Sequence, residues 1–96
     1  MNTKDAYTQK IEAELELVQA KLAEFKARAK SLTADARIQH AKQVDDLEQR
    51  VDAMKAKLKE LGNASEDAWE QLKDGVENTW GTLQSAVQDI VTNFKK

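Results

Sequence analysis

The chain of 96 residues has no cysteine, no proline and only three glycines. Without cysteine it can form no disulfide and offers no thiolate for nucleophilic or metal chemistry. Without proline, no fixed kink interrupts a helix, and the few glycines leave few positions that favour a tight turn. Aromatic residues make up only 5% of the chain, so most of the core must be aliphatic.

Long apolar runs and a large excess of one charge are also missing. No stretch approaches the roughly 18 apolar residues of a membrane-spanning helix, and the opening MNTKDAYTQK lacks the apolar segment of a signal peptide. The formal net charge of −2 gives no overall field that would attract nucleic acid. We therefore expect a cytoplasmic protein.

The residues that are abundant are those that favour α-helix. Ala, Glu, Lys, Leu and Gln dominate, and charged residues make up 33% of the chain. The length is that of one domain, so residues 1–96 are expected to form a single helical domain. Because its large apolar side chains are few for this length, an elongated all-α bundle or antiparallel coiled coil is expected.

Two heptad seams run through the first two thirds of the sequence. Their apolar residues follow alternating steps of three and four, as on one face of a packed helix. The first seam is Ile11, Leu15, Val18, Leu22 and Phe25, and the second is Val44, Leu47, Val51, Met54, Leu58 and Leu61. The second repeats the first after 36 residues, or ten helical turns, so on one unbroken helix both seams would share a face.

Two architectures fit these seams. In the first, which we predict, residues 3–61 form one continuous helix of about 90 Å, a second helix spans about 64–95, and a second chain covers the remaining apolar strip, giving a homodimer. In the alternative, the chain turns near residues 31–35 and forms a three-helix bundle. Ser31, Thr33 and Asp35 are each suitable N-caps for that turn.

The break near residues 61–65 is common to both architectures. Gly62 stands where the residue after a helix end belongs, and Asn63 or Ser65 can cap the next helix. Beyond it, residues 66–76 and 77–87 form an 11-residue repeat, EDAWEQLKDGV and ENTWGTLQSAV. Such a repeat keeps its apolar residues on one side of a nearly straight helix. We call this set the tryptophan stripe: Trp69, Leu72, Val76, Trp80, Leu83, Val87 and Phe94.

No constellation in the sequence points to catalysis or to a metal. His40, the only histidine, has no neighbouring nucleophile or ligand pattern, and we interpret it as a surface or seam-edge residue. The carboxylates lie in solvated helix faces, often four residues from a basic residue, as in Glu24–Arg28 and Asp46–Arg50. We predict no catalytic residues, no metal site and no cofactor, and a non-catalytic protein.

The tryptophan stripe has three interpretations. The first is helix packing, with the stripe docked on residues 44–61 and small residues beside it allowing close approach. The second is a helix that lies on a membrane surface, which an 11-residue amphipathic repeat permits. The third is docking of another protein's helix. A separate alternative, weak nucleic-acid binding through the basic segment 21–42, is disfavoured because no aromatic residue outside the seam is interleaved with its charges.

Most of the chain also resembles a known family, and the specific part of the resemblance lies in the last third. The pattern D-A-W-E-x-L-K-x-G-V-E-x-x-W, found here over residues 67–80, is similar to small bacterial coiled-coil stress-response proteins, best known from cyanobacteria. The resemblance implies a small helical protein linked to salt, light or osmotic stress, and it supplies no catalytic residues. The chain departs from the family at Ser31 and Thr33, which favour a turn, and at Gly81 and Thr82, which loosen the last helix.

Overall fold

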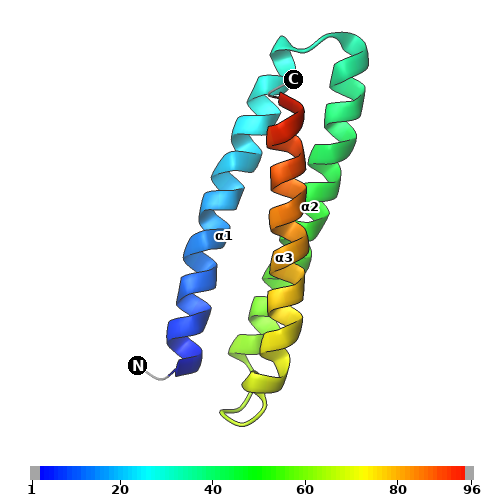
Figure 1. Cartoon of the computed structure of the whole chain (residues 1–96). Helices are drawn as coiled ribbons and strands as arrows, with labels where there is room; N and C mark the ends of the chain where they lie inside the picture. Colours follow the sequence, from blue (N-terminus) through cyan, green and yellow to red (C-terminus); the bar gives the residue numbers. More distant parts are fainter. Residues whose placement is uncertain (1–2, 95–96) are drawn as a thin grey trace.

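The computed structural model describes residues 3–94, and of Phe94 it describes the backbone alone. Its elements are α1 (Thr3–Arg28), the short 3₁₀ turn η1 (Ala29–Ser31), α2 (Ala34–Gly62) and α3 (Trp69–Phe94). No strand occurs between residues 3 and 94, so the expected all-α class is confirmed. The three helices lie side by side in an elongated bundle of 51 × 19 × 19 Å (Figure 1).

The prediction of one continuous helix over residues 3–61 is wrong, and the alternative with a turn near residues 31–35 is correct. α1 ends at Arg28, and the backbone becomes extended at Leu32 (ψ 154°) and Thr33 (ψ 164°). Thr33 then caps α2, because its side chain accepts a hydrogen bond from the Ala36 N–H at 3.3 Å.

Arg37 of α2 stabilises this turn by hydrogen bonds to its backbone. Its guanidinium donates from Nε to the Ala29 carbonyl at 3.1 Å, and from Nη2 to the carbonyls of Lys30 at 3.4 Å and Leu32 at 3.3 Å. These carbonyls lie at the end of α1, where the helix itself supplies no donor. The turn lets the α1 seam bury itself against its own chain, so a second chain is not needed to cover it.

The α2–α3 connection falls where the sequence places it, but α3 begins later than residue 64. Ser65 forms the cap, with its Oγ accepting from the Ala68 N–H at 3.2 Å and its carbonyl accepting from the Trp69 N–H at 3.1 Å. Gly62 is the last residue of α2, and no described residue has a positive φ. The left-handed glycine that often follows a helix is therefore not used at this end.

Contacts between α1 and α2 show that the two helices run in opposite directions. Lys4, near the start of α1, reaches the carbonyl of Ala64 beyond the end of α2, whereas Lys26 forms an ion pair with Glu48. In Figure 1, α3 then returns, so that its last turns lie near the α1–α2 turn.

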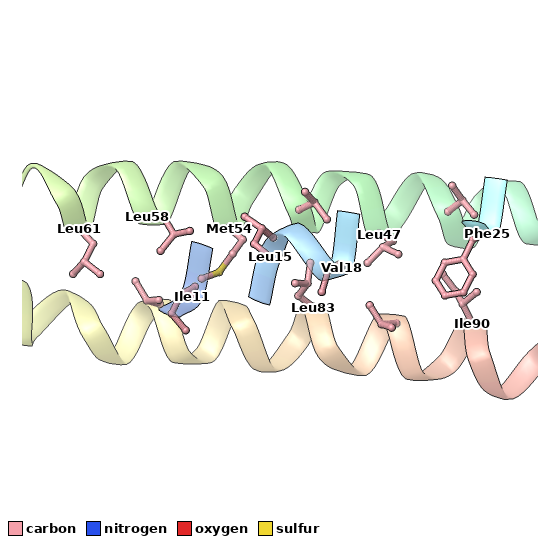
Figure 2. Close-up of a cluster of buried hydrophobic side chains, with 14 of the residues drawn as sticks. Ile11, Leu15, Val18, Phe25, Leu47, Met54, Leu58, Leu61, Leu83 and Ile90 are labelled. Carbon is pink, nitrogen blue, oxygen red and sulfur yellow. The ribbon is translucent and has the colours of Figure 1, made fainter. Parts of the chain in front are cut away.

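The core runs along the whole axis of the bundle. Leu22 is half-buried, and the other residues of both seams are buried. Figure 2 shows side chains of α1, α2 and α3 pointing into the same interior, with Leu47, Met54, Leu61, Leu83 and Ile90 among the most deeply enclosed. At about 25 cal/mol per Å² of apolar surface, this shared interior is the main stabilising contribution.

Candidate functional site

The tryptophan stripe faces the interior of its own bundle. Trp69, Val76, Leu83 and Val87 are buried, whereas Leu72 and Trp80 are half-buried against the same core. Phe94 ends α3, and its side chain lies outside the described part of the structure. Ile90, which adjoins the stripe, is only 1% exposed.

The small residues beside the stripe are also half-buried, namely Ala68, Gly75, Thr79 and Ala86. α3 packs more closely on α2 than on α1. A Cβ added at Gly75 would meet nothing within 4 Å, so this glycine does not mark a close approach of two helices. α3 packs mainly on α2, whereas Trp69 contacts Tyr7 in the N-terminal part of α1.

Tyr7 of α1 packs beside Trp69, and Lys4 of α1 binds the nearby α2–α3 connection. The Tyr7 and Trp69 rings have centroids 6.0 Å apart and are tilted by 41°, a favourable aromatic geometry. Lys73 places its Nζ 5.2 Å from the centroid of the Tyr7 ring. Lys4 Nζ donates to the Ala64 carbonyl at 2.9 Å and, more weakly, to the Gly62 carbonyl at 3.4 Å. The start of α1 is thereby tied to the α2–α3 connection.

The hydroxyl of Tyr7 is enclosed without a hydrogen-bond partner among the described residues. Burial raises the pKa of Tyr7, and the negative charge of Glu77, followed by those of Glu14 and Asp74, raises the pKa further. The Glu77 carboxylate acts here through its charge, since it is not in hydrogen-bond geometry with Tyr7 Oη. The phenol is therefore held in its neutral form.

His40 is buried (6% exposed), so the surface interpretation is wrong and a position along the α2 seam is correct. Its Nε2 lies 2.7 Å from the Phe25 carbonyl oxygen. Because a carbonyl only accepts, Nε2 carries the hydrogen and donates it. His40 continues the α2 seam at the usual step before Val44, and this spacing is the signal that could have placed it in the core.

The basic segment 21–42 lies around the α1–α2 turn, and several of its charges have partners within the chain. Lys26 pairs with Glu48, and Arg28 pairs with Glu24 at 2.8 Å. Arg37 is bound to the carbonyls of the turn. These contacts reduce the charge available to a phosphate backbone.

The remaining features carry little chemistry. Across residues 3–94, no group of three or more His, Asp or Glu side chains is arranged to hold a metal ion. An open groove between α2 and α3 is lined by polar and small residues, including Asp46, Arg50, Asn78, Thr82 and Ser85, and its Asp46 and Arg50 already pair at 2.8 Å. None of the described helices has the length and apolarity needed to cross a bilayer.

Comparisons with known proteins identify no relative of this chain. No protein-family model, curated protein or solved structure shows significant similarity to the chain. The class that the structure defines is a small three-helix bundle with a continuous apolar core. The stress-protein resemblance of residues 67–80 stays an expectation from sequence.

Proposed function

We propose that the protein is a non-catalytic helical structural or interaction protein, in which the tryptophan stripe serves as the internal packing face. The observation that carries this proposal is the burial of Trp69, Val76, Leu83 and Val87 against helices of the same chain. A stripe that is already covered does not need a membrane or another protein to remove it from water.

A protein partner would then contact the solvent-exposed faces of the helices. These faces are mostly polar or charged, and Leu17 (68% exposed) and Ile38 (61% exposed) are the large apolar residues that stand out on them. Both side chains can contribute to a helix–helix contact with another protein. In line with the resemblance of residues 67–80, we propose a stress-related role in the bacterial cytoplasm.

Tryptophan emission tests the proposal directly, because both tryptophans belong to the stripe. Two single-tryptophan variants, Trp80→Phe and Trp69→Phe, report separately on the buried and the half-buried position. We expect blue-shifted emission from Trp69 in buffer, a redder emission from Trp80, and no change in either on adding vesicles of zwitterionic or anionic lipid. A helical circular dichroism spectrum equal to that of the unaltered chain is the control for folding.

The second candidate is a membrane-surface protein whose α3 leaves the bundle and lies on lipid. The half-buried Trp80 favours it, because an indole at the edge of an apolar face suits a lipid interface. Emission from Trp69 that is red-shifted in buffer, and moves to the blue only with vesicles, would replace the first proposal by this one. Lys73 is the single cation between Trp69 and Phe94, so electrostatic attraction to anionic lipid contributes little.

A further inference from the structure

The α1–α2 turn consists of residues that can all adopt a helical conformation. Neither glycine nor proline occurs between Arg28 and His40, and no described residue has a positive φ. Arg28 is already helical, residues 29–31 form a 3₁₀ turn, and only Leu32 and Thr33 have extended ψ values. Rotating these two ψ angles to about −40° would join α1 and α2 into one helix.

Such a straightened chain would place both seams on the same face. The seams are offset by 36 residues, which is ten turns of an α-helix. Ile11 therefore aligns with Leu47, Leu15 with Val51, and Val18 with Met54. Within the hairpin of a single chain this agreement serves no purpose, because the turn sets the rotation of α2 independently of α1.

The pairing of α1 residues with α2 residues in the bundle is also compatible with a straightened chain. Lys4 contacts Ala64, Phe25 contacts His40, and Lys26 contacts Glu48, and the midpoint of every pair falls between Leu32 and Arg37. Two straightened chains can run in opposite directions and cross at this midpoint. Each α1 residue would then lie opposite the same α2 residue as in the single chain, but that α2 residue would belong to the other copy.

We propose that α1 exchanges between two copies of this chain, giving a dimer in which each α1 packs on α2 and α3 of the other copy. Every core contact of the single chain is then retained, and only the turn changes. The single chain keeps the three-helix fold described above, and straightening is a property of the pair. This inference concerns the turn and does not depend on the function proposed above.

Exposed contacts hold the turn in its closed form. They are the Thr33 cap on Ala36 and the Arg37 contacts. The Ser31 hydroxyl donates to the Arg28 carbonyl at 2.8 Å, a bond that a continuous helix can also make. The double variant Ser31→Ala/Thr33→Ala removes the Thr33 cap and raises helix propensity at two exposed positions. Since the dimer opens two turns, losing the cap in both should raise the association constant roughly 30-fold.

Ala34→Pro is the matched control. Ala34 is the first residue of α2, where proline is favoured, and Thr33 before it already has the extended backbone that proline requires. In a straightened helix the proline ring would clash with the Lys30 carbonyl. We expect this variant to keep the closed bundle and to remain monomeric.

The experiment refolds each full-length chain from urea at high protein concentration and measures its mass by sedimentation. A second measurement identifies the exchange. Because the chain has no cysteine, Lys26→Cys chains and Glu48→Cys chains can be refolded together and oxidised. We expect dimers for the unaltered chain, more for Ser31→Ala/Thr33→Ala and none for Ala34→Pro, with a disulfide joining positions 26 and 48 of different chains.

Three results would overturn the proposal. The first is a lack of dimers at every concentration in both the unaltered chain and the Ser31→Ala/Thr33→Ala variant. The second is dimerisation of Ala34→Pro to the same extent as the unaltered chain. The third is a dimer that forms without the link between positions 26 and 48.

Discussion

Replacing Trp69 with alanine tests the packing of the bundle most directly. Trp69 is 5% exposed and packs near Tyr7, so its loss should cost about 3–5 kcal/mol of unfolding free energy. Trp80 occupies the equivalent place in the 11-residue repeat but is half-buried, and Trp80→Ala should cost roughly half as much. A domain of this size has a total stability of about 5–14 kcal/mol. Trp69→Ala should therefore lower Tm by at least about 12 °C.

Urea unfolding followed by helical circular dichroism measures both changes without relying on tryptophan emission. Trp69→Phe is the control, because it keeps an aromatic ring in the same place and should cost less than Trp69→Ala. A change within about 0.5 kcal/mol for Trp69→Ala would refute the packing described here. An equal cost for Trp69→Ala and Trp80→Ala would refute the argument that burial, rather than repeat position, sets the energy.

Three further predictions follow from single side chains. The raised pKa of Tyr7 means that its neutral form favours the folded state, so stability should be complete below pH 10 and fall as pH rises through the folded-state pKa. Tyr7→Phe should remove this part of the alkaline loss and leave stability at pH 7 equal or up to about 1 kcal/mol higher, as measured by urea unfolding across pH. Equal alkaline losses in both chains would contradict the assignment. Gly75→Ala and Gly81→Ala should each raise the unfolding free energy by about 0.5–1 kcal/mol, because neither glycine has a positive φ and an added Cβ would meet nothing within 4 Å. A lower Tm in either variant would show that the added methyl group collides with a neighbour. His40→Leu should keep a side chain of similar volume but lose the hydrogen bond to the Phe25 carbonyl, and thermal unfolding should show a loss of about 1–2 kcal/mol in unfolding free energy. An unchanged Tm would mean that this hydrogen bond makes no net contribution to stability.

The parts of the fold that could be predicted depend on residues close to one another in the sequence. Abundant helix formers and the absence of proline specify helices, and the spacing of Leu47, Val51 and Met54 specifies which face is buried. The connection near Ser65 was also predictable, since capping depends on neighbours along the chain. Within the candidate site, the repeat was sufficient to identify Trp69, Val76 and Leu83 as one apolar face.

The turn at residues 29–33 could not be settled in this way. Its residues suit either a helix or a cap, and the 36-residue agreement between the seams favoured the straight form. The closed form depends on contacts across the hairpin, from Arg37 to the carbonyls of η1 and from His40 to Phe25. Those contacts exist only after α1 and α2 have come together.

The sequence by itself determined that this chain is helical, where its last connection lies and which side chains avoid water, because each of these follows from interactions within a few turns of helix. Only the tertiary structure decided that α1 packs on its own chain, that Tyr7 packs beside Trp69 and that His40 is buried. These outcomes depend on which helix faces meet, and that is settled by burying three apolar faces at once in one core.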